Sequence, residues 1–108
     1  MAIIRGTTPT LTFHIKNDHI DLNELAQVWI TFKTKAGIKV VEQTYDREDV
    51  TIDTEEHTIE LFLSQEDTLA LTDKTMLLQM RMRLDNDLAY ASSISEVEIG
   101  QILKDGVI

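Results

Sequence analysis

The chain of 108 residues contains no cysteine. This absence excludes disulfide bonds, zinc–thiolate sites and cysteine nucleophiles together. Long apolar runs are also missing, since the longest are only a few residues, far short of the roughly 20 that a helix needs to cross a bilayer. The opening residues, Met1 to Arg5, do not have the three-part layout of a secretory signal. We therefore expect a soluble domain that is made in the cytosol and has no membrane partner.

Basic residues are few. The chain has 10 Lys and Arg against 19 Asp and Glu, which gives a formal net charge of −9. Nucleic-acid binding depends largely on cationic groups that displace phosphate counterions, so we expect no nucleic-acid partner. An acidic surface also helps to keep a β-protein soluble and apart from like-charged copies. The length predicts a single domain, residues 1–108, with a modest hydrophobic core.

The sequence also lacks a recognisable catalytic constellation. There is no Gly-x-Ser-x-Gly segment of the kind that presents a nucleophilic serine. The three histidines, His14, His19 and His57, are not spaced like metal ligands. Function must be argued from a site, and none is visible here. We therefore predict that the protein is not an enzyme and needs no cofactor.

Acidic residues are concentrated between Glu42 and Asp67. Hard cations such as calcium bind where several oxygen ligands converge from a loop, but this spacing lacks the glycine and the terminal acid of a helix–loop–helix site. Acidic turns that discourage edge-to-edge strand pairing explain the cluster, with a weak ion site as the alternative. We therefore predict no metal site. The candidate ligands of that alternative are Asp46, Glu48, Asp49, Asp53 and Glu55.

What the sequence does contain is a strict period of two. Five apolar residues alternate with outward positions between Thr75 and Leu84, namely Met76, Leu78, Met80, Met82 and Leu84. A strand points successive side chains to opposite faces, so this segment predicts a strand with one apolar row against a core. The intervening row, which includes Arg81 and Arg83, is expected to face outward.

Similar patterns predict six further strands, at residues 11–16, 28–33, 38–44, 50–52, 58–63 and 88–100. A reversal is expected at Lys35-Ala36-Gly37, because glycine tolerates the positive φ of a tight hairpin. Ile94, Val97 and Ile99 break the strict alternation of the last strand, and a β-bulge near Ser95 and Glu96 would restore its inward phase. Ser64 followed by Asp67 predicts a capped helical turn. The fold predicted is all-β: a two-layer immunoglobulin-like β-sandwich of about seven short strands, with one helical turn near residues 65–71 and a small closed barrel as the alternative.

Trp29, Arg81 and Arg83 are candidate interface residues. If their strands are neighbours, an outward Trp beside two Arg stems forms an anchor of the kind enriched in binding hot spots, with Tyr90 as a further member. The alternative is that Trp29 lies inward at a margin of the sandwich and that the arginines pair with nearby acids. At the ends of the chain, Ile3 and Ile4 are expected to cover a sheet edge. Val107 and Ile108 are further interface candidates, able to fray, to cover an edge or to add a strand to a neighbour.

Four segments resemble stretches of small prophage-encoded proteins of Gram-positive bacteria. They are residues 3–13 (IIRGTTPTLTF), 29–33 (WITFK), 63–69 (LSQEDTL) and 100–108 (GQILKDGVI). Such proteins are of about this length and are encoded among tail or other virion structural genes. The arrangement is also similar to the N-terminal β-sandwich of phage baseplate upper proteins. The long C-terminal extension of those proteins has no counterpart here, so no fibre or receptor-binding role is expected.

The resemblance implies a non-catalytic virion structural or tail/baseplate assembly module that acts by protein–protein contact. Its partners would be other phage structural proteins, with formation of a homo-oligomer left open. It would be found in the bacterial host cytoplasm during assembly and in the virion tail afterwards. The residues leave two other functions open. One is a carbohydrate- or cell-surface-binding β-sandwich module, and the other is a hydrolase accessory, which needs two carboxyl groups that face each other across a cleft.

Overall fold

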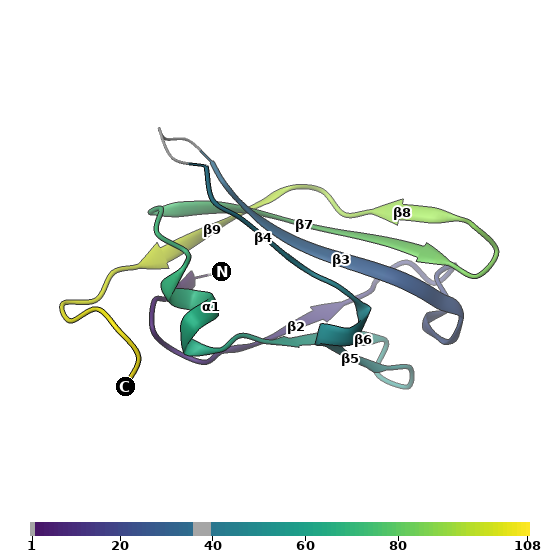
Figure 1. Cartoon of the computed structure of the whole chain (residues 1–108). Helices are drawn as coiled ribbons and strands as arrows, with labels where there is room; N and C mark the ends of the chain where they lie inside the picture. The colour runs from purple at the N-terminus through teal and green to yellow at the C-terminus, as the bar shows by residue number, and fades with distance from the viewer. Residues whose placement is uncertain (1, 36–39) are drawn as a thin grey trace.

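Nine strands and three short helices make up the described part of the chain, residues 2–35 and 40–108 of the computed structural model (Figure 1). The strands are β1 (Ala2–Ile4), β2 (Thr10–His14), β3 (Leu25–Thr34), β4 (Glu42–Tyr45), β5 (Val50–Asp53), β6 (Thr58–Phe62), β7 (Thr75–Leu84), β8 (Ala89–Ala91) and β9 (Ser95–Gly100). The helices are the 3-10 turns η1 (Leu22–Glu24) and η2 (Arg47–Asp49) and the α-helix α1 (Gln65–Leu69). Among these residues, no helix is long and apolar enough to span a membrane.

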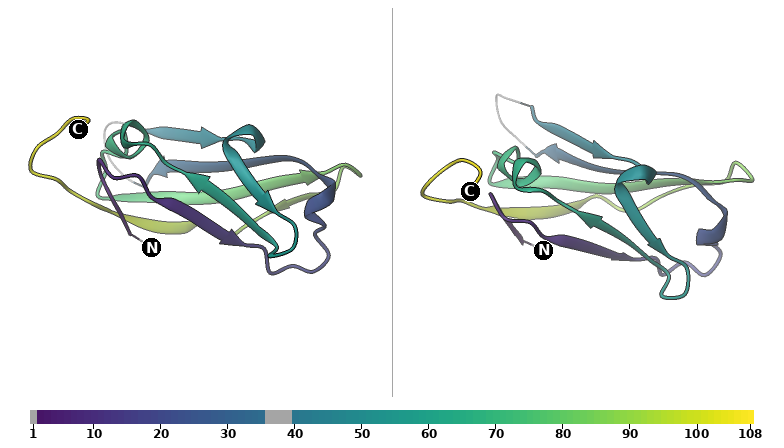
Figure 2. Two further views of the ribbon diagram at one scale, coloured as in Figure 1. Left: turned by 90° about the horizontal axis from the view of Figure 1, so that it is seen from below. Right: turned by 60° about the horizontal axis from the view of Figure 1, so that its bottom comes forward.

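The strands form two sheets that lie face to face (Figure 2). The larger sheet has the order β1-β9-β7-β3-β4, with β8 also paired to β7, and the smaller sheet has the order β2-β6-β5. Each sheet buries one face against the other, which is how amphipathic strands remove their apolar side chains from water. The predicted two-layer β-sandwich is confirmed. In the described ranges the two sheets remain separate and do not close into a barrel.

Strand β7 confirms the predicted period of two and has the predicted bounds. All five apolar residues of its inner row are buried, whereas Arg81 and Arg83 are exposed. Strand β3 pairs with β7 along almost its whole length. The two sheets contribute to one buried cluster, since Ile59 and Leu61 of β6 pack in it together with the inner rows of β3 and β7. Burial of each such side chain stabilises the fold by roughly 1.5–3 kcal/mol.

The structure has two more strands than the seven predicted. One is β1, which runs parallel to β9 and buries Ile3 to 2% exposure, so the expected covering of a sheet edge is confirmed. The other arises because the predicted strand 88–100 is divided into β8 and β9, both of which pair with β7. Ser92 lies between them. Its N–H donates to the carbonyl of Met80 (2.8 Å), and its hydroxyl accepts from the N–H of Met80 (3.0 Å).

From Ser95 to Glu98, β9 stays in unbroken register with β7, so the bulge predicted near Ser95 and Glu96 is wrong. The bulge was expected because Ile94 broke the alternation. Ile94 lies just outside the strand and is exposed, so nothing requires its side chain to turn inward. Instead of a bulge, the structure has a break between β8 and β9 at residues 92–94.

The predicted helical turn is confirmed as α1. The Ser64 hydroxyl accepts from the N–H of Asp67 (3.1 Å), and the Asp67 carboxylate accepts from the N–H of Ser64 (2.8 Å). This capping box satisfies two amide donors that a helix start leaves without partners. The buried hydroxyl of Thr68 donates to the carbonyl of Thr7 (2.9 Å), so α1 packs on the link between β1 and β2.

The hairpin between β3 and β4 was predicted at Lys35-Ala36-Gly37. Residues 36–39 lie outside the described part of the chain. On either side, β3 and β4 pair antiparallel from Ile30 opposite Tyr45 to Lys33 opposite Glu42. The strand predicted at 38–44 is therefore β4, with later bounds.

Candidate functional site

The outward rows of β3 and β7 form the most distinctive surface of the larger sheet. Trp29 lies directly opposite Arg81 in the pairing of these two strands. Its neighbours Val28 and Ile30 are fully buried, and because side chains alternate along a strand, Trp29 must face outward. It is 47% exposed. The alternative in which Trp29 points inward is therefore wrong.

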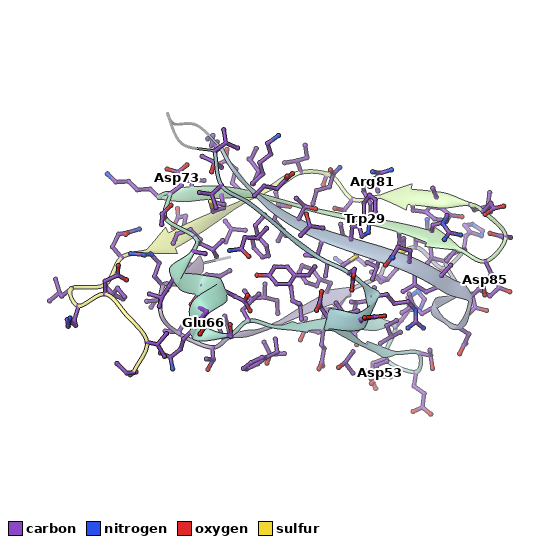
Figure 3. The ribbon with its side chains drawn as sticks, in the orientation of Figure 1. Trp29, Asp53, Glu66, Asp73, Arg81 and Asp85 are labelled. Carbon is purple, nitrogen blue, oxygen red and sulfur yellow. The ribbon has the colours of Figure 1, made fainter. Side chains whose placement is uncertain are left out.

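Arg81 lies on the indole ring of Trp29 (Figure 3). The guanidinium carbon is 5.6 Å from the ring centroid, which is the geometry of a cation–π contact. At an exposed site such a contact contributes about 0.5–1 kcal/mol. Among the ion pairs of the described residues, none involves Arg81. Its charge is therefore held in place by the ring and remains open to a partner.

Arg83 lies two residues farther along the same face of β7. Its guanidinium is 3.5 Å from the carboxylate of Asp87, and both side chains are largely exposed. An exposed pair of this kind contributes little stability because water and salt screen it. Tyr90 is not part of this surface. It pairs with Met82 on the inner side of the sheet and packs half-buried against the core.

Two hollows border the Trp29–Arg81 pair. The larger is a shallow groove of about 580 Å³ whose walls include Thr31, Glu42, Leu77, Gln79 and Ile94. The smaller, of about 160 Å³, extends toward Gln27, Arg83 and Ala89. We refer to Trp29, Leu77, Arg81, Arg83 and Ile94 as the outer patch. It presents apolar side chains next to cations, with hydrogen-bonding side chains around them.

Two members of the outer patch were not identified from the sequence. Leu77 occupies an outward position of β7, so the alternation along that strand could have identified it as a member of the outer surface. Ile94 is 61% exposed. It was expected to face the core, because the separation of β8 from β9 has no signature in a pattern of apolar residues.

The structure does not bring Val107 and Ile108 to the outer patch. The C-terminal segment folds back toward α1, at one end of the molecule and away from Trp29 (Figures 1 and 3). There the N–H of Ile108 donates to the side-chain oxygen of Gln65 (2.9 Å), and the Gln65 amide donates to the Ile108 carbonyl (3.2 Å). Both apolar side chains remain exposed. The C-terminal end is therefore held against α1 by polar contacts, an arrangement that differs from the three options considered for it.

Several aspartates between Glu42 and Asp67 accept hydrogen bonds from nearby backbone N–H groups. Asp46 and Asp49 form the capping box of η2. Asp53 accepts from the N–H groups of Glu55 and Glu56, at 3.0 Å each. In residues 2–35 and 40–108, no three Asp, Glu or His side chains are arranged to hold a metal ion.

Tyr45 is a titratable group that sequence reasoning did not single out. It lies on the inner side of β4 with its ring edge against Phe32, at 6.2 Å between centroids. Burial raises the pKa of its hydroxyl far above the ordinary value, and the carboxylate of Asp67 in α1 raises it further. The Tyr45 hydroxyl donates to the side-chain oxygen of Gln43 on the same strand (3.3 Å). Tyr45 lies on the core side of the sheet, away from the outer patch.

No protein-family model matches the sequence, and no curated protein matches it.

Proposed function

We propose that this protein is a non-catalytic assembly module that binds another protein through the outer patch. The observation that carries the proposal is the exposed Trp29 with Arg81 held on its ring. Trp and Arg are enriched among residues that contribute most to protein–protein binding, because they combine a large apolar area with directional polar contacts. A partner that covers this pair removes half-exposed indole surface from water and meets a pre-positioned cation.

The biological setting that we propose is a phage tail or baseplate. Support comes from the resemblance of residues 3–13, 29–33, 63–69 and 100–108 to small prophage-encoded proteins. In this setting the partners are other virion structural proteins. The protein assembles with them in the bacterial host cytoplasm and stays in the tail. The acidic, cysteine-free β-sandwich is compatible with such a role.

The test is binding to the products of neighbouring genes, measured with purified proteins. Trp29→Ala should abolish binding to the true partner without changing the melting temperature by more than a few degrees, because the side chain lies outside the core. Leu103→Ala is the matched control, since it truncates an exposed apolar side chain that lies outside the outer patch. Binding that survives Trp29→Ala, or absence of the protein from purified virions together with no binding to any tail protein, would refute the proposal.

A second candidate function is binding of a carbohydrate. The groove beside Trp29 favours it, because an exposed ring lies next to side chains that form hydrogen bonds, among them Thr31, Gln79 and Glu42. Sugar sites combine these features. A glycan array probed with the wild-type protein and with Gln79→Ala tests this function. No signal on the array would remove it.

A further inference from the structure

The outer patch has a charge that is unusual for this molecule. The net charge of the chain is −9, yet Arg81 and Arg83 stand two residues apart on one outward row. Along a strand, two such positions are separated by about 7 Å. The patch therefore offers an aromatic ring and a pair of cations with a fixed spacing. Charge complementarity favours a partner that presents a carboxylate next to an apolar group.

The outer side of the smaller sheet presents that combination. Phe62 of β6 is 59% exposed, and Glu60 lies two residues before it on the same side of the strand. Both must face outward because Ile59 and Leu61 are fully buried. Threonines surround them, since Thr12 and Thr51 pair with Glu60 and Thr10 pairs with Phe62. We call these five residues the Phe62 face: Thr10, Thr12, Thr51, Glu60 and Phe62.

The outer patch and the Phe62 face point in opposite directions, because each lies on the outside of one layer of the sandwich. Figure 3 shows Trp29 and Arg81 on one side of the molecule and Asp53, at the end of β5, on the other. The two surfaces are complementary in charge and in apolar content, and one molecule carries both.

We infer that the outer patch binds a second copy of this chain, which docks with its Phe62 face. This inference rests on the proposed function, since it names the partner of the same patch. In the contact, Phe62 lies beside Trp29, and the carboxylate of Glu60 meets Arg81 or Arg83. The contact is heterologous: each copy uses one surface and leaves the other free, so assembly continues into a chain or closes into a ring.

The size of the contact predicts weak association. The smaller sheet has three strands of four or five residues, which is a small area beside the interfaces of stable complexes. The net charge of −9 also opposes self-association, although physiological salt screens charges that lie more than about 8 Å apart. We therefore expect a dissociation constant on the order of 100 µM, with assembly that grows with protein concentration.

Sedimentation velocity of the wild type and of two double variants, in which uncharged serine replaces the contact residues, tests the inference. One variant, Trp29→Ser with Arg81→Ser, loses the outer patch, and the other, Glu60→Ser with Phe62→Ser, loses the Phe62 face. Each variant alone should stay monomeric at concentrations at which the wild type forms larger species. An equimolar mixture should form a dimer and nothing larger, because only one intact patch and one intact Phe62 face can meet. If a double variant melts early, Arg81→Gln and Glu60→Gln replace it.

Three results would overturn the inference. The wild type could stay monomeric up to about 1 mM. The Phe62-face variant could assemble as the wild type does, which would indicate that the patch binds another patch. The mixture could remain monomeric. In each case the proposed function is judged separately, by whether Trp29→Ala abolishes binding to a different tail protein.

Discussion

At the scale of single residues, the alternation along β7 decides which side chains hold the fold. Met76 is fully buried, whereas its neighbour Leu77 faces outward and is half-buried. We expect Met76→Ala to lower the free energy of unfolding by about 2–5 kcal/mol, because it leaves a cavity in the core. Leu77→Ala should lower it by less than about 1 kcal/mol. Urea denaturation measures both values, and equal losses would contradict the assigned faces.

Tyr45 makes stability depend on pH. Burial and the nearby carboxylate of Asp67 raise the pKa of its hydroxyl, so the folded protein holds the phenolic proton more tightly than the unfolded chain does. This contribution is complete below the ordinary tyrosine value of roughly 10 and is lost as the pH rises above it. Relative to Tyr45→Phe, the wild type should therefore lose stability as the pH rises above about 10.

Urea unfolding at several pH values measures this loss. Tyr90→Phe is the matched control, because it removes a hydroxyl from the other tyrosine and leaves Tyr45 in place. A wild type and a Tyr45→Phe variant whose stabilities change in parallel would show that Tyr45 does not titrate with folding.

At the scale of elements, Gly6 lets the chain leave the larger sheet and enter the smaller one. Its φ is +76°, and a β-carbon placed there would lie 3.3 Å from the terminal methyl of Ile102. We expect Gly6→Ala to destabilise the fold by about 1–2 kcal/mol, since residues with a side chain disfavour this backbone conformation. Thr8→Ala is the matched control, because Thr8 is an exposed residue of the same link and its φ is not positive. Thermal melts that fall equally for both variants would contradict this role of Gly6.

The capping box of α1 provides a second prediction about an element. Ser64→Ala removes the hydroxyl that accepts from the N–H of Asp67, so we expect a loss of about 1 kcal/mol in the free energy of unfolding. Ser93→Ala, at an exposed position between β8 and β9, should have little effect. The two variants are compared by urea denaturation. Equal stabilities would indicate that the cap does not support the fold.

The sequence predicts which face of a strand or helix is buried better than it predicts which strands pair with each other. The period of two located β7 and placed Arg81 and Arg83 outward, and the Ser64–Asp67 spacing located α1. Which strands pair is decided by contacts between residues that are far apart in the chain, and no local pattern records them. The Trp29–Arg81 contact depends on the register of β3 against β7. The division of β8 from β9 depends on the hydrogen bonds of Ser92, so the exposure of Ile94 could not be predicted.

At the scale of the whole molecule, both sheets contribute to a single buried cluster. We therefore expect the chain to unfold in one transition, as a single domain over residues 1–108 would. The fluorescence of Trp29, the only tryptophan, reports on the larger sheet, and far-ultraviolet circular dichroism reports on both sheets. The two signals should have the same midpoint in urea. A fluorescence transition at a different urea concentration would show that the sheets unfold separately.

The parallel pairing of β1 with β9 makes the timing of biosynthesis important. Ala2–Ile4 leave the ribosome long before their partner segment Ser95–Gly100 has been translated. Until then Ile3 stays in contact with water, and the edge of β7 that receives β9 stays open. A nascent chain that stalls before Ser95 would expose this edge to other chains and would be prone to aggregate. Completion of the sandwich must therefore follow translation of its last strand.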